Sequence, residues 1–260
     1  MKRLPIVLLL VFAVFSIALS TTMQKAKPRA AKHENSGAEC HGWSYNGSTG
    51  PAYWSRLFPR DCSLTAQSPV NIISSTPRSS PAIEFTYGAS RLAVNRVEYA
   101  PRVTYDPGSS ITYGGRTYKL EQFHFHLPGE HKVSNGAYVM EMHLVHKTED
   151  GLHSAAVGVL FRTEGPDNPE YKPIVDNLPP PGSDHGGTGP RIEAEKLLPA
   201  NRAYYKYTGS LTTPCCSEPV LWLLLAEPVK ISVDQLRKFQ FSQGGRHNSR
   251  PVKREIRADT

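Results

Sequence analysis

Two histidine-containing runs constrain the possible folds of this chain more than any other feature. They are Gln122-Phe123-His124-Phe125-His126 and Glu141-Met142-His143-Leu144-Val145-His146. In a β-strand, successive side chains point to opposite faces of the sheet. If the first run is a strand, Gln122, His124 and His126 therefore share one face.

In the second run, Glu141, His143 and Val145 share a face in the same way. Sixteen residues separate His126 from His143, which is enough for a turn and the return of a neighbouring antiparallel strand. Three imidazoles would then converge from two adjacent strands. Three histidines with an open fourth position describe a catalytic zinc site, whereas structural zinc sites fill all four positions with protein ligands.

The alternative is that these histidines are ordinary core residues with hydrogen-bond partners, which is the usual explanation for one His-x-His alone. Two observations favour a metal. The third histidine lies in register, and a polar residue, Gln122 or Glu141, stands two positions before a histidine on each strand. The sequence therefore predicts a Zn²⁺ site formed by His124, His126 and His143.

The first 39 residues are expected to lie outside the folded domain. Residues 1–20 combine a positive start, an apolar run and the small-residue ending Ala18-Leu19-Ser20, which is typical of a cleaved secretory signal peptide. The alternative is a transmembrane anchor, but the run is short for a bilayer span of about 20 residues. Residues 21–39 are basic and lack apolar periodicity, so they are predicted to form a flexible leader. The folded domain would then span residues 40–260 of a secreted protein, extracellular or periplasmic.

Charge and composition narrow the choice of partners. The formal net charge of +7 falls to about +5 once the signal peptide is removed. The basic leader lacks interleaved aromatic residues and the chain is expected to be secreted, so no nucleic-acid partner is expected. No second long apolar run follows the first, so no membrane span is predicted. Asn46-Gly47-Ser48 is a glycosylation sequon, which matters only in a eukaryotic host.

The four cysteines indicate disulfides rather than a second zinc site. Cys40, Cys62, Cys215 and Cys216 lack the paired spacing of metal ligands, and a secreted chain meets an oxidising environment. A bond between the adjacent Cys215 and Cys216 would be strained. Each of the two is therefore expected to pair with Cys40 or Cys62, and the residues alone leave both pairings open.

Short strands separated by turns dominate residues 42–229, and a chain of this size can form one β-rich domain. Residues 221–225 are nearly all apolar, which is typical of a strand buried on both faces. The Pro179-Pro180-Pro181 run followed by Gly186-Gly187 predicts an exposed loop. The predicted strands are residues 116–126, 138–146, 155–162, 204–209 and 219–227, and the predicted helices are residues 169–178 and 232–241.

Further motifs, taken with the histidine runs, make the chain resemble one family. They are Trp43-Ser44-Tyr45, Gln67-Ser68-Pro69-Val70-Asn71-Ile72, Gly209-Ser210-Leu211-Thr212-Thr213-Pro214 and Asn248-Ser249-Arg250-Pro251. From about Cys40 onward the chain resembles a secreted α-class carbonic anhydrase. The resemblance implies a single, mainly β (α+β) domain around a central twisted, mostly antiparallel sheet of about ten strands, with a few short helices.

The resemblance also implies a reaction. It is the reversible hydration of carbon dioxide to bicarbonate and a proton by zinc-bound hydroxide. His124, His126 and His143 would be the zinc ligands, as strand alternation already suggests. Their other ring nitrogens would be held, in that order, by Gln122, the backbone carbonyl of Asn248, and Glu141.

Further roles follow from the same resemblance. The Thr212 hydroxyl would donate to Glu130 and so accept from the hydroxide, which orients the nucleophile toward the substrate. The remaining implied residues are Val145, Leu211, Val220 and Trp222 as an apolar substrate wall, Thr213 as a bicarbonate contact, and Cys62 with Cys216 as a disulfide.

The chain departs from the family pattern at three positions. Tyr99 stands near the position at which many members carry a proton-shuttling histidine. Ala156 replaces an apolar-wall valine, which would widen the substrate pocket. Cys215 replaces a proline that typically follows a cis bond, so the loop is expected to run differently there. Cys40 and Cys215 are additional to the family's disulfide, and their mutual pairing is a hypothesis.

Three classes of protein remain as hypotheses. The first is an active secreted zinc lyase, which the complete histidine set favours. The second is a catalytically silent relative that acts in binding, storage or a mineral matrix, although such members usually lose a zinc histidine. The third is an unrelated metallohydrolase, against which stands the lack of a His-Glu-x-x-His motif.

Overall fold

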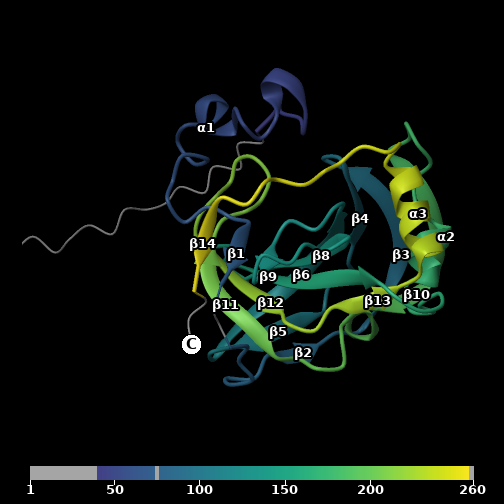
Figure 1. Ribbon diagram of the computed structural model, residues 1–260. Coiled ribbons are helices and arrows are strands. Elements are labelled where there is room, and N and C mark those ends of the chain that lie inside the picture. The colour runs from purple at the N-terminus through teal and green to yellow at the C-terminus, as the bar shows by residue number, and fades with distance from the viewer. Residues whose placement is uncertain (1–39, 74–75, 258–260) are drawn as a thin grey trace, which may run out of the picture. The chain divides into compact units, whose positions relative to one another are not determined.

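The computed structural model describes residues 40–73 and 76–257, which lie within one compact unit. The predicted signal peptide and leader, residues 1–39, lie outside the described residues. A sheet of 11 strands occupies the centre of the unit (Figure 1). Eight of its strands follow one another in the order β10 (His185–Glu193), β3 (Ala89–Val97), β4 (Ala100–Thr104), β6 (Arg116–His126), β8 (Met140–Lys147), β9 (Ser154–Thr163), β12 (Val220–Leu225) and β11 (Tyr204–Gly209).

Three shorter strands complete this sheet. Strand β2 (Glu84–Thr86) pairs with β5 (Ser110–Tyr113), β5 pairs with β6, and β13 (Val229–Ile231) pairs with β9. Most pairs are antiparallel, but β12 and β13 run parallel to β9. A separate parallel sheet joins β14 (Arg254–Ile256), β1 (Val70–Ile72) and β7 (Lys132–Val133). The prediction of a mainly β, mostly antiparallel fold is therefore confirmed, with 11 strands in the central sheet in place of about ten.

Alternation along β6 and β8 separates core residues from the three histidines predicted to bind zinc. Phe123 and Phe125 of β6 and Met142 and Leu144 of β8 are fully buried in the main hydrophobic cluster. Burying a large apolar side chain contributes roughly 1.5–3 kcal/mol, so these four residues determine which face of each strand meets the core. A slip of one residue would turn all of them to the opposite face. The same register therefore holds His124, His126 and His143 on the face opposite this core, whereas His146 lies on the core face and bonds to the Tyr87 hydroxyl.

The helices of the described residues are short. Helix α3 (Val233–Ser242) agrees with the predicted helix at residues 232–241 and begins with a capping box, in which Ser232 Oγ accepts from Gln235 N at 3.0 Å. Helix α2 (Lys172–Asp176) is shorter than the predicted residues 169–178 and contacts β10 and α3. The remaining helical segments are α1 (Trp54–Leu57) and the 3-10 turns η1 (Gly47–Thr49) and η2 (Ala194–Leu197). None of the described helices has the length and apolar composition of a membrane span.

The predicted exposed loop around Gly186-Gly187 is wrong from His185 onward, because β10 begins there and pairs with β3. Glycine within a strand often marks a close approach of neighbouring backbone. A Cβ atom on Gly186 would overlap the carbonyl oxygens of Asn177 and Val94, and one on Gly187 would overlap the Asn177 side chain. The two glycines therefore allow an edge strand to pack against the end of α2.

Two disulfides join the segment before β1 to the loop between β11 and β12. Cys62 pairs with Cys216, as the resemblance implied, and Cys40 pairs with Cys215. The expectation that the loop runs differently at Cys215 is wrong in one respect. The Pro214–Cys215 peptide bond is cis although cysteine stands in place of proline.

We expect the two disulfides to contribute non-additively to stability. Each spans a long separation, 154 or 175 residues, but once either bond exists the other closes a loop of only roughly 25 residues. Chain entropy then gives at most about 3.5 kcal/mol for a bond added second and about 8.5 kcal/mol for both together. Replacing one bonded pair with alanine should therefore lower the free energy of unfolding by less than half the loss in the fourfold variant. Urea denaturation of the three variants checks this, and strictly additive losses would contradict it.

Candidate metal centre

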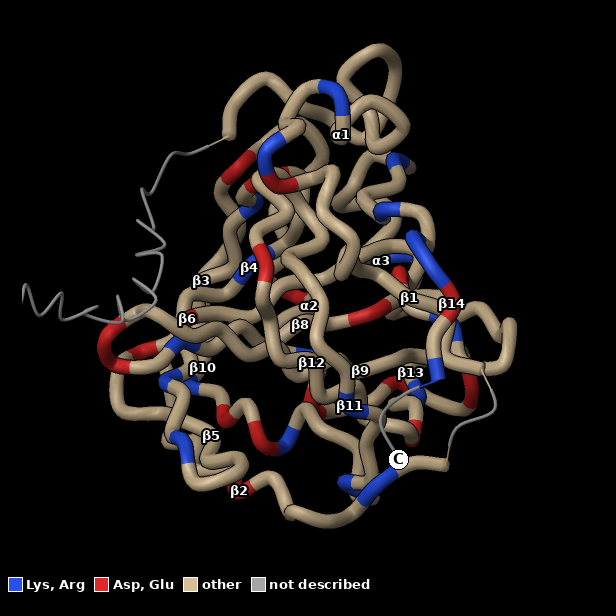
Figure 2. The backbone as a smooth tube through the Cα atoms, turned by 90° about the vertical axis from the view of Figure 1, so that its left-hand side faces the viewer, with Lys and Arg blue, Asp and Glu red and all other residues tan. Residues whose placement is uncertain are grey.

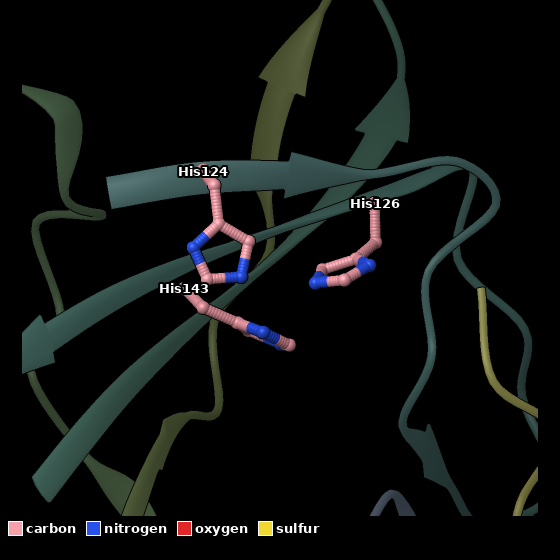
Figure 3. A group of neighbouring side chains, drawn as sticks. All are labelled: His124, His126 and His143. Carbon is pink, nitrogen blue, oxygen red and sulfur yellow. The ribbon is translucent and has the colours of Figure 1, made fainter. Parts of the chain in front are cut away.

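Strands β6 and β8 bring the three predicted zinc ligands together. In their antiparallel register His124 lies opposite His143, and His126 lies opposite Glu141. The three imidazoles point toward one another (Figure 3), with ring centroids 4.6, 4.9 and 5.3 Å apart. One nitrogen of each ring lies within 4.8 Å of a nitrogen of each of the other two. The structure thus places all three histidines on one face of the sheet, which is the arrangement that strand alternation predicts.

Each ring is oriented by a hydrogen bond from one of its nitrogens to an oxygen. The bonds run from His124 Nδ1 to Gln122 Oε1 at 2.9 Å, from His126 Nδ1 to the Asn248 carbonyl at 2.7 Å, and from His143 Nε2 to Glu141 Oε1 at 2.8 Å. Because the acceptors are oxygens, these nitrogens carry the ring protons. The lone pairs are left on Nε2 of the first two histidines and on Nδ1 of the third.

These free nitrogens have the properties of metal ligands. His126 Nε2 is buried and has no hydrogen-bond partner among the described residues, which is rare for a buried polar atom unless a ligand such as a metal satisfies it. Burial lowers the pKa of His126 to about 4 and holds the pKa values of His124 and His143 below the ordinary value. The rings are therefore neutral at physiological pH, the form that binds metals. Three neutral imidazoles with an open fourth position fit Zn²⁺.

Sequence reasoning missed a buried hydrogen-bond chain that continues from the triad. Glu141 Oε1, which accepts from His143, also accepts from His131 Nδ1 at 2.5 Å. The Tyr207 hydroxyl donates to His131 Nε2 at 2.5 Å and lies 2.9 Å from Ser68 Oγ. His131, Glu141 and His143 also lie close enough to hold a metal, but these hydrogen bonds already occupy their facing atoms. No sequence pattern marks His131, because it lies in a loop and Tyr207 is 76 residues away.

Glu130 and Thr212 lie beside the triad. The Glu130 side chain is buried, and its Oε1 accepts from Arg250 N at 2.7 Å and lies 3.5 Å from His126 Nδ1. Burial raises the pKa of Glu130 to about 7, while the Thr212 hydroxyl favours the charged form. Glu130 Oε2 has no partner with full hydrogen-bond geometry among the described residues. The carboxylate therefore retains an acceptor that Thr212 can use.

Arg250 ties together three segments around the site. Its backbone N–H donates to Glu130, and its guanidinium donates to the Ser68 carbonyl and to Gln67 Oε1, each at 2.7 Å. The Gln67 amide in turn donates to the Cys216 carbonyl at 3.2 Å. A buried guanidinium thus connects the C-terminal segment, the start of β1 and the loop that carries Thr212. The sequence shows Arg250 only as part of a family motif.

A cavity of about 250 Å³ opens beside the triad. Val145, Ala156, Leu211 and Trp222 give it an apolar wall, and the two threonines that follow Leu211 line it as well. Val220, which was predicted for this wall, is buried in the adjoining hydrophobic cluster and does not line the cavity. It belongs to the same hydrophobic cluster as Trp222 of that wall.

Tyr99 does not face this cavity. Its hydroxyl donates to the Trp43 carbonyl at 3.1 Å, and its ring packs against Trp43 and Tyr45 with centroids 5.3 and 5.8 Å apart. The side chain lines a separate hollow of about 520 Å³ that contains none of the three triad histidines. Tyr99, which stands near the position that the resemblance assigns to a proton-shuttling histidine, is thus directed toward the N-terminal segment.

Comparisons with known proteins agree with this geometry. Residues 49–259 match the family model of the eukaryotic-type carbonic anhydrases. A carbonic anhydrase of a Nostoc species is 37% identical over 224 residues, which cover 81% of either chain. A carbonic anhydrase of Neisseria gonorrhoeae is 35% identical over 256 residues, which cover 97% of this chain and 93% of the relative.

A solved structure agrees as well. It is the α-carbonic anhydrase from Thermovibrio ammonificans in complex with the inhibitor sulfanilamide, which is 36% identical with a TM-score of 0.72. The match covers 82% of this chain and 95% of that structure. Because the family model matches residues 49–259 and these relatives share its fold over most of its length, the chain belongs to the eukaryotic-type, or α-class, carbonic anhydrase family.

Proposed function

We propose that this protein catalyses the reversible hydration of carbon dioxide to bicarbonate and a proton, with zinc held by His124, His126 and His143. One observation carries the proposal: three imidazoles, each with a free lone pair, converge beside a cavity with an apolar wall. The three histidines would hold zinc, which would lower the pKa of a bound water to about 7 and so would supply a nucleophile at physiological pH.

Thr212 is proposed to orient that nucleophile. A threonine hydroxyl has one hydrogen to donate. With this hydrogen directed to Glu130, Thr212 Oγ1 can only accept a hydrogen bond from a group in the cavity. Burial raises the pKa of Glu130 to about 7, and the Arg250 N–H and the Thr212 hydroxyl oppose that rise by favouring the charged, accepting form. The pair therefore selects the nucleophile orientation in which a lone pair faces the substrate.

The apolar wall suits an uncharged substrate. Carbon dioxide carries no net charge and no hydrogen-bond donor, so contact with Val145, Leu211 and Trp222 is favourable. Ala156 leaves more room than the valine that is usual in the family. Thr213 lies on the cavity wall with a hydroxyl that suits contact with bicarbonate once it forms.

We also propose that the protein acts outside the cytosol on a small-molecule substrate. The two disulfides support an oxidising compartment, and the composition of residues 1–20 supports secretion to the periplasm or the extracellular space. Basic and acidic residues are interspersed around the sheet (Figure 2), a distribution that favours a small molecule over nucleic acid as partner.

Replacing a ligand and replacing an orienting residue should have different effects. His143→Ala removes a lone pair and should lose both zinc and activity. Thr212→Ala should keep zinc and lose about 10²- to 10³-fold in turnover, by analogy with the loss of a positioned donor. Metal analysis together with a carbon dioxide hydration assay checks both. His153→Ala, at an exposed histidine, is the control and should change neither quantity. Equal zinc loss in the first two variants would count against the assigned roles.

The position of Tyr99 predicts a dependence on buffer. Each hydration releases a proton that must leave the site, and tyrosine is a poor carrier at neutral pH. Turnover at saturating carbon dioxide should therefore rise with added imidazole buffer, while kcat/KM changes little. Because the side chain at position 99 points away from the triad cavity, Tyr99→His should not replace the added buffer, and neither should Tyr53→His on an exposed tyrosine. Initial rates against buffer concentration at fixed pH and ionic strength test this, and a high, buffer-insensitive turnover in the wild type would refute it.

A further inference from the structure

Arg102 is a cationic side chain beside the zinc histidines. Strand β4 pairs with β6 so that Arg102 lies directly opposite His124. Opposed residues of an antiparallel pair point to the same face, with Cβ atoms about 4.5–5.5 Å apart. Arg102 also lines the triad cavity, together with Thr213. Its positive charge therefore lies next to the place where an anionic product forms.

The protein satisfies the guanidinium only in part. Arg102 Nη2 contacts Glu98 Oε2 at 3.2 Å, and the side chain is 23% exposed. Arg102 Nε is buried and has no hydrogen-bond partner among the described residues. A buried donor without an acceptor is unfavourable. Since Nε is buried, an acceptor in the cavity can reach the guanidinium only through its amino groups.

Glu98 reaches Arg102 from a strained backbone position. A two-residue turn, Glu98-Tyr99, joins β3 to β4, and its φ angles are 49° and 70°. Both lie in the left-handed region, where glycine and asparagine are preferred. Such strain tends to persist where the surrounding structure and the function require it. Here glutamate supplies the contact to the Arg102 guanidinium, which a glycine could not make.

The other cation on the cavity wall has a different environment. Lys147 of β8 contacts Glu121 Oε2 at 3.1 Å, and the two side chains are 44% and 45% exposed. Solvent screens an exposed pair of this kind. An ammonium group is also a point charge without a planar set of donors. Lys147 is therefore a matched control: it places the same charge on the cavity wall but lacks the planar donors of Arg102.

We infer that Arg102 binds bicarbonate through its two amino groups, and so gives the cavity a preference for planar carboxylate-like anions. The identity of the anion rests on the proposed function. A guanidinium presents parallel N–H donors that match the two oxygens of such a group. Carbon dioxide carries no charge and gains little from this contact. Arg102 is thus a residue that determines specificity for the anionic side of the reaction.

Acetate is a suitable probe because it has a planar carboxylate and does not react, and chloride is its spherical counterpart. NMR line broadening of labelled acetate and of chloride would measure their affinities for the zinc-loaded protein. Arg102→Gln should raise the Kd of acetate about tenfold, the range for a lost charge-assisted hydrogen bond. Arg102→Lys should keep the chloride affinity within about twofold of the wild type and still bind acetate weakly. Lys147→Gln should change either Kd by less than about threefold.

Three outcomes would overturn the inference. They are an unchanged acetate affinity in Arg102→Gln, an equal loss in Lys147→Gln, and a wild-type acetate affinity in Arg102→Lys. Melting temperature and zinc content identify any variant that fails to fold. If Arg102→Gln fails to fold, the acetate affinity of Arg102→Lys tests the inference instead. Acetate binding does not require turnover. A protein that binds acetate through Arg102 but does not hydrate carbon dioxide would therefore contradict the proposed function and leave the anion contact standing.

Discussion

The buried carboxylate of Glu141 is the interaction on which the rest of the metal centre depends. Its Oε1 accepts from His143 and His131, and its Oε2 accepts from the backbone N–H groups of Glu130 and His131. Burial opposes ionisation, but the two imidazoles and their hydrogen bonds outweigh it and hold the pKa of Glu141 well below its usual value. One charge therefore orients a candidate zinc ligand and also fixes the loop that carries Glu130. An uncharged substitute at this position would leave several buried donors without an acceptor.

The sequence could predict those parts of the fold and site that depend on local geometry. Strand alternation has a period of two, so the face shared by His124 and His126 follows from their spacing alone. The predicted strands at residues 116–126 and 204–209 have the bounds of β6 and β11. Gln122 and Glu141 stand two residues before their histidines, so their contacts follow from the strand itself. The Asn248 contact is different, because 122 residues separate it from His126. Only the family resemblance predicted it.

The parts that the sequence did not reveal depend on contacts between distant segments. The residues alone left both cysteine pairings open, since Cys215 and Cys216 are adjacent and either can reach the same place. The sequence alone places Gly186 in a loop. Its role in a strand becomes clear only from the close approach of the Asn177 and Val94 carbonyls. The direction of Tyr99 likewise depends on the N-terminal segment against which its ring packs. In each case the local sequence pattern allows more than one structure, and a contact with a residue distant in the sequence determines which one forms.

The two disulfides impose an order on the maturation of the chain. Cys40 and Cys62 emerge first when a chain is made or exported from its N-terminus, and their partners follow 175 and 154 residues later. Until then the only cysteines of the chain that they can meet are each other. A bond between them does not occur in the folded structure, so thiol–disulfide exchange must undo it if it forms. In the proposed oxidising compartment, correct oxidation must therefore wait until Cys215 and Cys216 are also present.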